Sequence, residues 1–233
     1  MNTKKLQISC LAFCLLLGSA FSVNLSADTL AKDILKNQYQ ISCTTYSDIF
    51  EHVPVLKTLS TECSSVVEIG LRSMVSTWGI LQGLAENPTN IKSYIGIDIS
   101  SPLPAKLEMA KTLAEHNQVQ FNFMQKNSMH ADIPNTDLLF IDSLHTYAHL
   151  SFELERYSNK INKYIAMHDT SAPWGDTDDN EYYGDYSEYP SYIDRTKKGL
   201  WLAVVDFLAN HPEWKLEERR LNNHGFTVLK RVY

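Results

Sequence analysis

The most constraining feature of the sequence is a pair of apolar, β-branched segments separated by about one helix. Residues 66–73 read VVEIGLRS, and residues 94–98 read YIGID. About 30 residues separate Glu68 from Asp98, which is the length of one strand–helix–strand unit. Such a unit places a glycine turn and an acid side by side at the carboxyl edge of a parallel sheet, where nucleoside ligands usually bind. The pair therefore predicts a parallel sheet and a nucleoside-type cofactor.

The same alternation continues along the chain. Strands are predicted at 66–70, 93–98, 119–125, 137–142 and 163–168, and helices at about 75–86, 103–116, 146–160 and 200–210. Strands that alternate with helices indicate an α/β fold with a doubly wound, mostly parallel, Rossmann-like sheet. Two further strand-like runs, 214–221 and 226–232, are joined by the sequence NNHG, which predicts a C-terminal antiparallel hairpin.

The N-terminal segment is typical of an export signal. Lys4 and Lys5 precede an apolar stretch at 8–21, and small residues follow up to residue 27. We interpret residues 1–27 as a signal peptide. An uncleaved membrane anchor is the alternative, because the apolar core is near the length at which the two become hard to separate. Both interpretations predict an exported protein, either periplasmic or secreted, or anchored to the membrane if the signal stays attached.

Charge and hydropathy narrow the choice of partners. The chain has 27 acidic and 21 basic residues, for a formal net charge of −6. Nucleic-acid binding depends on clustered positive charge, and the basic residues gather only at 195–198 and 219–220, so nucleic acid is not an expected partner. Since no second apolar run of membrane length occurs, we expect no membrane contact beyond the N-terminal signal. The remaining chain is predicted to be a mildly acidic globular domain.

Cysteine usage leaves two alternatives open. Of the four cysteines, Cys10 and Cys14 lie in the signal segment, so Cys43 and Cys63 remain as an even pair. An exported protein can form a disulfide from such a pair, and this bridge would stabilise the fold by on the order of 3 kcal/mol. Two buried thiols are the alternative.

Two segments differ from the strand–helix alternation. Residues 28–65 have helical spacing of apolar residues and are predicted to form an N-terminal helical cap on the main domain at 66–233. Residues 173–196 are rich in Asp, Glu and Tyr, too polar for a core and too long for an ordinary connection. We interpret them as a lid, a partner surface or a disordered segment. Aromatic faces there suit planar or sugar-like acceptors.

The ends of the fourth and fifth predicted strands carry the most specific motifs. Residues 140–147 read FIDSLHTY and residues 164–169 read YIAMHD. Together with the acid that ends the second strand and the terminal hairpin, these motifs resemble the class I S-adenosylmethionine-dependent methyltransferases. The resemblance covers roughly residues 66–233. It is greatest to the branch that contains small-molecule O-methyltransferases and cephalosporin-hydroxylase-like proteins.

The resemblance implies S-adenosylmethionine as the cofactor and Glu68 and Gly70 as part of its site. In the family, an acid and a glycine-rich turn follow the first strand, and glycine leaves room for a ligand pressed against the turn. Residues 71–74 read LRSM where further glycines are common. The alternative for Gly70 is a simple turn between strand and helix.

The resemblance also implies cofactor contacts after the second and third strands. Asp98 matches the acid that accepts hydrogen bonds from the ribose hydroxyls, with a helix cap as its alternative. Asn127 and Ser128 stand where the family often contacts adenine, although a polar turn explains them equally well.

A third group of residues predicts the catalytic chemistry. Asp142 and Asp169 end adjacent parallel strands, and two carboxylates at one sheet edge suit Mg²⁺ or another divalent ion. The resemblance implies that this metal binds the acceptor hydroxyls and that His145 is the general base, with a pKa near neutrality. His168 or Thr170 would complete the ligand set. The alternative for the whole group is structural: helix capping, loop packing and the end of a strand.

These expectations combine into one function with two alternatives. The first is methyl transfer from S-adenosylmethionine to a hydroxyl of a small molecule or glycan, assisted by a divalent metal. Because S-adenosylmethionine is made inside cells, the second is an exported methyltransferase-like binding module without catalysis, which the single glycine of the turn favours. The third is a metal-dependent hydroxylase or hydrolase that uses Asp142, His145 and Asp169.

Overall fold

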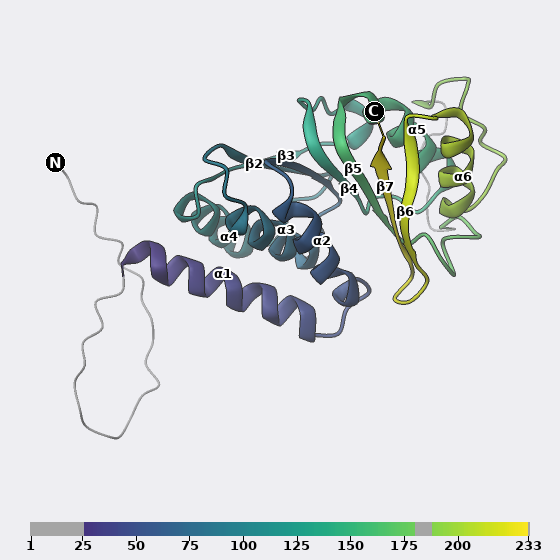
Figure 1. Ribbon diagram of the computed structural model, residues 1–233. Helices are drawn as coiled ribbons and strands as arrows, with labels where there is room; N and C mark the ends of the chain where they lie inside the picture. The colour runs from purple at the N-terminus through teal and green to yellow at the C-terminus, as the bar shows by residue number, and fades with distance from the viewer. Residues whose placement is uncertain (1–25, 180–187, 233) are drawn as a thin grey trace.

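A computed structural model of the protein describes residues 26–179 and 188–232 (Figure 1). The strands are β1 (Ser65–Ile69), β2 (Lys92–Asp98), β3 (Val119–Gln125), β4 (Thr136–Ile141), β5 (Ile161–His168), β6 (Trp214–Arg220) and β7 (Phe226–Arg231). The α-helices are α1 (Ala27–Thr44), α2 (Val53–Thr61), α3 (Val75–Glu86), α4 (Pro104–His116), α5 (Tyr147–Tyr157) and α6 (Leu200–Asn210). Short 3₁₀ turns are η1 (Phe50–His52), η2 (Ser128–His130) and η3 (Ser158–Lys160).

All seven strands of the described residues join one sheet in the order β3-β2-β1-β4-β5-β7-β6. Strands β1 to β5 pair in parallel, whereas β7 runs antiparallel to both β5 and β6. The prediction of a doubly wound, mostly parallel sheet with a terminal hairpin is therefore confirmed. The strand order reverses between β1 and β4, and ligands of such sheets bind outside the carboxyl ends at this reversal.

Both faces of the sheet are covered by helices, which explains why its central strands β1 and β4 are mostly apolar and buried. Adjacent residues of a strand point to opposite faces. Accordingly, Val66 belongs to an apolar cluster that includes residues of α1, α2, α3 and α4. The next residue, Val67, belongs to a second cluster that includes residues of α5 and α6. Figure 1 shows the same division, with α1 to α4 on one side and α6 beside the β6–β7 pair.

Helix α2 packs closely on α3 because two glycines remove side chains from the contact. A Cβ added at Gly79 would lie 2.8 Å from the Val53 side chain, and one at Gly83 would lie 2.3 Å from the carbonyl oxygen of Lys57. Helix α2 begins at Val53, with Pro54 in its first turn, where a missing amide hydrogen costs little. Residues 27–61 thereby form helices that lie against the α3 face of the sheet.

The two cysteines in the described part of the chain are both free. Cys63 is fully buried, and burial raises the pKa of its thiol to about 12. Cys43 is only partly buried. The bridge expected as one alternative is absent, so the structure agrees with the thiol alternative, except that only one of the two thiols is in the core.

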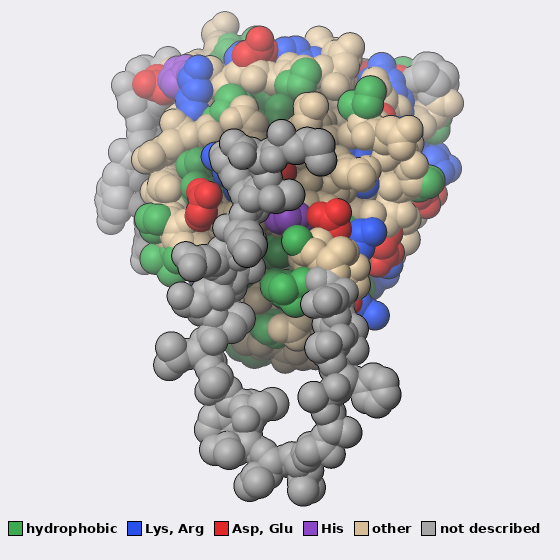
Figure 2. Space-filling view, turned by 90° about the vertical axis from the view of Figure 1, so that its left-hand side faces the viewer, with side chains coloured by type: hydrophobic (Ala, Val, Ile, Leu, Met, Phe, Trp, Pro, Cys, Tyr) green, Lys and Arg blue, Asp and Glu red, His purple; other side chains and the backbone are tan. Residues whose placement is uncertain are grey.

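Two sequence expectations concern residues that the structure does not describe. The predicted export signal lies almost entirely within 1–25, and the centre of the Tyr-rich segment lies within 180–187. No helix in the described part of the chain is long and apolar enough to cross a membrane. On the face shown in Figure 2, acidic and basic side chains are intermingled rather than gathered into areas of one sign.

Candidate functional site

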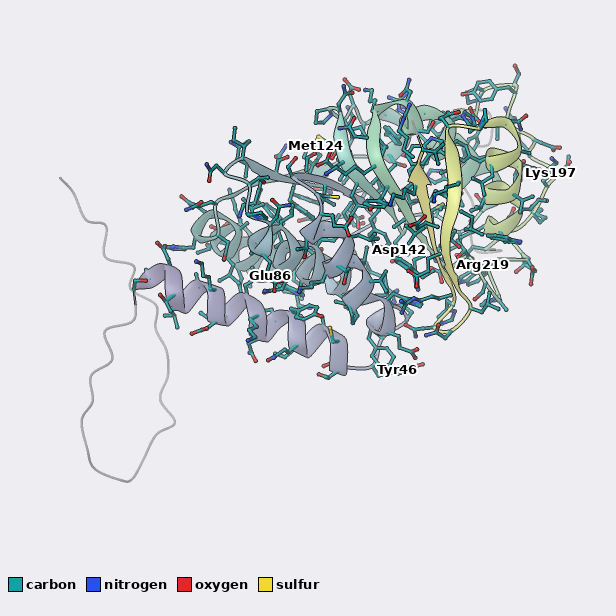
Figure 3. The ribbon with its side chains drawn as sticks, in the orientation of Figure 1. Tyr46, Glu86, Met124, Asp142, Lys197 and Arg219 are labelled. Carbon is teal, nitrogen blue, oxygen red and sulfur yellow. The ribbon has the colours of Figure 1, made fainter. Side chains whose placement is uncertain are left out.

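A cavity of about 350 Å³ opens at the carboxyl ends of β1, β2 and β4, where the strand order reverses. The predicted site residues that line it are Gly70, Asp98, Asn127, Ser128, Asp142, His145 and Asp169. Two others, Glu68 and His168, are buried behind its wall. Figure 3 shows Asp142 near the middle of the molecule, between the half that carries Glu86 and the half that carries Arg219.

The glycine turn after β1 is required by the neighbouring strand end. Gly70 has φ +87°, and a Cβ there would lie 1.8 Å from the carbonyl oxygen of Asp142. Arg72 and Met74 also have left-handed φ values of 43° and 64°. In this fold Gly70 makes room for the backbone that follows β4; it also lines the cavity, and its contact with a cofactor stays a prediction.

Glu68 lies behind the glycine turn and does not line the cavity. Its carboxylate accepts hydrogen bonds from the hydroxyls of Ser76, Thr77 and Tyr94, with Thr77 Oγ1 at 2.8 Å. The side chain is completely buried, and this burial raises the pKa of Glu68 to about 7. The expected cofactor contact of Glu68 is corrected accordingly. Its oxygens accept hydrogen bonds from the start of α3 and from the Tyr94 hydroxyl on β2 instead.

Asp98 joins the end of β2 to the glycine turn. Its Oδ2 accepts hydrogen bonds from the amides of Leu71 at 2.8 Å and Arg72 at 2.9 Å, and Oδ1 accepts one from Ser100 at 2.9 Å. A carboxylate offers about four acceptor positions, so about one remains for a ligand. Asp98 lies where a ribose would be expected, but binding two hydroxyls requires one of the turn amides to move.

The wall near η2 contains a buried histidine that sequence reasoning missed. Asn127 Oδ1 caps η2 through the amide of Met129 at 2.9 Å. Ser128 Oγ lies 3.1 Å from His149 Nε2, and the other ring nitrogen of His149 lies 2.8 Å from the Tyr189 hydroxyl. His149 and Glu153 are one helical turn apart on α5 and 3.1 Å apart in space. This spacing was the available sequence signal for the pair.

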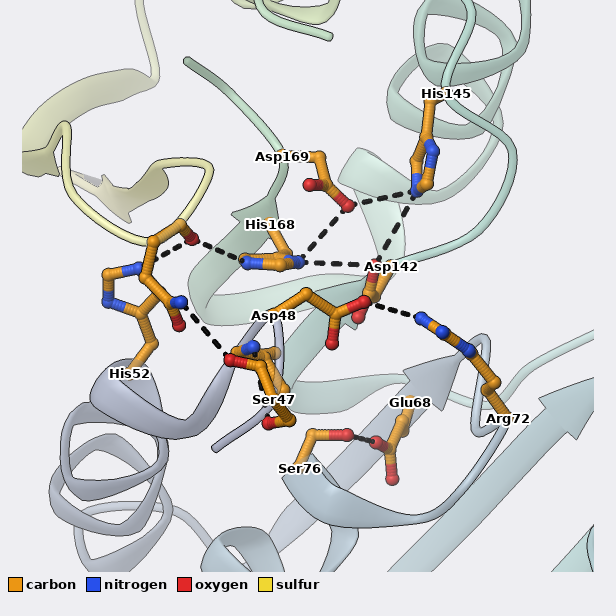
Figure 4. Close-up of polar contacts among 12 residues, drawn as sticks. Ser47, Asp48, His52, Glu68, Arg72, Ser76, Asp142, His145, His168 and Asp169 are labelled. Atoms are coloured by element: carbon orange, nitrogen blue, oxygen red, sulfur yellow. Dashed lines mark hydrogen bonds and ion pairs between the residues drawn. The ribbon is translucent and has the colours of Figure 1, made fainter. Parts of the chain in front are cut away.

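Asp142, His145, His168 and Asp169 form one cluster (Figure 4). His145 Nε2 lies 2.9 Å from Asp169 Oδ2 and 3.9 Å from Asp142 Oδ1. His168 Nδ1 lies 3.1 Å from Asp169 Oδ2 and 3.5 Å from Asp142 Oδ1. The topology explains the convergence, because Asp142 follows β4 and His168 ends the neighbouring strand β5. The ring of His145 is held beside them by stacking on Trp174, at a centroid distance of 5.4 Å.

The charges of this cluster determine the protonation of its members. Burial alone would lower the pKa of His145, but hydrogen bonds to Asp142 and Asp169 outweigh burial and raise it to about 9. The pKa of His168 is likewise raised by the charge of Asp142, against the effect of burial. In return, the pKa of Asp169 is lowered. The expectation of a His145 pKa near neutrality is therefore wrong for the cluster as described.

Comparison with solved structures identifies the fold. An O-methyltransferase of Bacillus cereus in complex with SAH is 13% identical, with 90% of this chain and 93% of that chain covered and a TM-score of 0.50. An SAH-bound methyltransferase of Podospora anserina is 12% identical, with 93% and 100% covered and a TM-score of 0.50. A methyltransferase of Geobacter sulfurreducens is 12% identical, with 91% and 92% covered and a TM-score of 0.51.

The fold is that of the class I methyltransferases. Neither a protein-family model nor a curated protein sequence matches the chain. At identities of 12–13% the likeness establishes the fold alone, so the chemistry of the site has to be argued from the residues of this chain.

Within this methyltransferase fold, the segment before α2 contributes a wall that the sequence did not predict. Asp48 lines the cavity and forms an ion pair with the guanidinium group of Arg72. The amide of Asn223 in the β6–β7 hairpin donates to the carbonyl of Ser47 at 3.2 Å, and His52 Nε2 lies 3.0 Å from the carbonyl oxygen of Asn222. No motif marks the two contacts with the hairpin, because they join residues 170 and 176 positions apart in the sequence.

The donor set for a metal is now defined among the described residues. One ligand atom each from Asp142, His168 and Asp169 lies within 4.8 Å of the others, so the three side chains could hold an ion. The hydroxyl of Thr170, the alternative third ligand, lies 2.8 Å from that of Thr227 and is buried. Of the two candidates for the third ligand, His168 is therefore the one that joins the carboxylates.

Proposed function

We propose that the protein is an S-adenosylmethionine-dependent methyltransferase that methylates a hydroxyl group of a small molecule or glycan. The observation that carries the proposal is one continuous cavity at the reversal of strand order. Its walls combine Asp98 and Ser128, at the nucleoside positions of the fold, with the reactive side chains of Asp142 and His145.

The cavity suits a cationic methyl donor. The carboxylates in its wall are those of Asp48, Asp98, Asp142 and Asp169, against the cationic side chains of Arg72 and Lys126 and the imidazole of His145, whose pKa is raised to about 9. S-adenosylmethionine would supply a positively charged sulfonium whose methyl group is electrophilic, and negative charge attracts it. Asp98 retains an acceptor position for a ribose hydroxyl, and Ser128 would lie beside the adenine.

His145 is the residue proposed to take the acceptor proton. Its Nε2 faces the cavity beside Asp169, and its side chain is 25% exposed, so an acceptor hydroxyl can reach it. Proton removal leaves a nucleophilic oxygen that bonds to the methyl carbon as the carbon–sulfur bond breaks. The negative charges of Asp142 and Asp169 raise the pKa of His145 and so hold a proton on its ring. A positive charge that neutralises these carboxylates would lower the pKa again and free His145 to accept the proton of the acceptor hydroxyl.

A divalent ion bound by Asp142, His168 and Asp169 would supply such a positive charge and would orient the acceptor oxygen. The residues fit the ion, because two carboxylates face the cavity edge and a buried histidine nitrogen is directed toward them without an aligned hydrogen bond. The metal assistance expected from the sequence is therefore retained as part of the proposal.

The proposal is tested by calorimetric titration of the full chain with S-adenosylmethionine and with its demethylated product, S-adenosylhomocysteine. We expect micromolar binding of both, and at least tenfold weaker binding, about 1.4 kcal/mol, by the variant Asp98→Asn. The variant Asp132→Asn is the control, because Asp132 pairs with Lys160 at the surface. Absence of binding by folded wild-type protein would overturn the proposal.

One observation favours a second candidate, an exported module that has the fold without the catalysis. Asp98 already accepts three backbone hydrogen bonds, and the turn beside it contains two non-glycine residues with left-handed φ. Most acceptor positions of Asp98 are thus occupied by backbone amides without any nucleoside. The same titration separates the two candidates, since a module of this kind binds neither S-adenosylmethionine nor its product.

A further inference from the structure

We infer that Asp142, His168 and Asp169 form a mixed nitrogen–oxygen site that selects a divalent transition metal such as Fe²⁺, Co²⁺ or Zn²⁺ over Mg²⁺. The inference deepens the proposed function, on whose metal site it rests, but it does not require the methyl donor. It depends on the geometry of one buried histidine and on the chemistry of its neighbours.

The two distances from the His168 ring nitrogen to the carboxylates are close to those between neighbouring ligands of one metal ion, and all three donor atoms lie within 4.8 Å of one another. Two ligands at right angles and about 2.1 Å from a metal ion lie about 3 Å apart. His168 Nδ1 lies 3.1 Å from Asp169 Oδ2 and 3.5 Å from Asp142 Oδ1. Asp142 and Asp169 line the cavity, whereas His168 is buried behind them. The remaining coordination positions therefore face the cavity.

The hydrogen bonding of His168 determines which ring nitrogen can bind a metal. Its Nε2 lies 3.0 Å from the carbonyl oxygen of Asn223, which can only accept, so Nε2 carries hydrogen. In the neutral ring, Nδ1 then has the lone pair and points toward the two carboxylates. Metal-binding histidines commonly have this arrangement, in which the distal N–H donates to a backbone carbonyl and fixes the tautomer.

In the metal-free protein the charge of Asp142 favours a protonated His168 ring, and the alternative is that this ring simply forms an ordinary ion pair with the carboxylates. In that case the Nδ1 hydrogen should align with one of the carboxylate oxygens. Instead, Nδ1 is a buried atom with no hydrogen-bond partner, although both oxygens lie within 3.5 Å. The ring is thus directed between Asp142 and Asp169, where an ion bound by all three side chains would lie.

The ligand types explain the selectivity. Mg²⁺ prefers oxygen ligands and dehydrates reluctantly, whereas imidazole suits zinc, iron, nickel and copper. The Thr170 hydroxyl, the oxygen ligand expected as an alternative to His168, is engaged by Thr227. A second imidazole, that of His145, lies 2.9 Å from Asp169 Oδ2 on the cavity side. The two carboxylates are therefore accompanied by imidazole nitrogen on both sides.

The test uses the full chain, purified without a histidine tag, freed of metal by a chelator and kept free of S-adenosylmethionine. Calorimetric titrations with MnCl₂, CoCl₂ and MgCl₂ are compared. We expect one Co²⁺ per chain, bound at least about tenfold more tightly than Mg²⁺, with the affinity for Mn²⁺ between the two. The visible absorption of bound Co²⁺ gives a second readout of nitrogen and oxygen ligands.

The variant His168→Asn puts an oxygen donor near the position of Nδ1. We expect Co²⁺ affinity to fall roughly 10- to 100-fold while Mg²⁺ affinity changes little. Asp142→Asn, which leaves the hairpin contact of His168 intact, should also weaken Co²⁺ binding. His116→Asn is the matched control, because His116 pairs with Asp28, outside the cavity. Circular dichroism establishes that each variant is folded.

Three results would overturn the inference: Mg²⁺ binding as tightly as Co²⁺, no metal binding by folded wild-type protein, or wild-type Co²⁺ affinity in folded Asp142→Asn. These results are independent of the proposed function. A protein that binds Co²⁺ but no S-adenosylmethionine supports the inference and contradicts the methyltransferase proposal. A protein that binds S-adenosylmethionine but no metal does the reverse.

Discussion

Glu68 shows how a residue identified from its position in a motif can have a different role in the fold. A carboxylate after the first strand suggests a ligand contact, yet three hydroxyl groups surround it and no water reaches it. Its position was predictable from the sequence, but its burial depends on Tyr94 and Thr77, which no local pattern brings to it. The pKa of His145 was likewise not predictable from its local sequence, because it is raised by Asp142 and Asp169, which follow two different strands.

The buried carboxylate predicts a specific pH dependence of stability. Because the folded state raises the pKa of Glu68 from 4.5 to about 7, its contribution is fully present below about pH 4.5 and is lost as the pH rises to 7. Relative to Glu68→Gln, wild-type protein should therefore lose roughly 3 kcal/mol of unfolding free energy across this interval. Urea denaturation of both proteins at pH 5 and pH 8 measures the difference.

The control for this experiment is Glu108→Gln on α4, which alters an exposed carboxylate. It should follow wild-type protein at both pH values. Equal pH dependence in wild-type protein and Glu68→Gln would contradict the assignment of Glu68 as a buried acid whose pKa the fold raises to about 7.

At the scale of elements, regular apolar spacing was a sufficient guide. Helices α3 and α6 and strand β3 begin and end at the residues predicted from the sequence. Strand β5 begins two residues earlier than predicted, because Asn162 and Lys163 are exposed at its start and interrupt the apolar pattern. The contacts between elements were not predictable in this way, since the pairing of α2 with α3 depends on two glycines whose role appears only in three dimensions.

Gly83 allows a prediction in which two effects have opposite signs. Alanine in a helix is favoured over glycine by about 1 kcal/mol, so helix propensity alone predicts that Gly83→Ala stabilises the protein. The added Cβ would, however, lie 2.3 Å from the carbonyl oxygen of Lys57 and 2.6 Å from the Ser60 side chain. We expect the clash to dominate, with a net loss of about 1–3 kcal/mol and a lower melting temperature.

Thr58→Ala is the comparison for this prediction. Thr58 is exposed on α2, so its replacement raises helix propensity without altering the packing against α3. It should leave the melting temperature unchanged or slightly higher. A stabilised Gly83→Ala protein would show that α2 and α3 do not approach each other as described.

The whole molecule joins three distant segments around one cavity. Asp48 before α2, Arg72 after β1 and Asn223 in the β6–β7 hairpin are connected by an ion pair and by hydrogen bonds that also hold His168. The sequence predicted which strand ends would carry the reactive side chains, because parallel strands place their carboxyl ends at one edge. It could not predict the segments that close the site, because their contacts follow from the packing of the complete chain.

The central claim is that a nucleoside methyl donor binds where the strand order reverses. Hydrogen exchange of the full chain, followed by mass spectrometry with and without saturating S-adenosylhomocysteine, tests this claim most directly. We expect slower exchange in peptides containing Leu71, Asp98 and Ser128, which line the cavity or support its turn. We expect no local change in the β6 strand at 214–220. Unchanged exchange around the cavity, or protection confined to another surface, would contradict the claim.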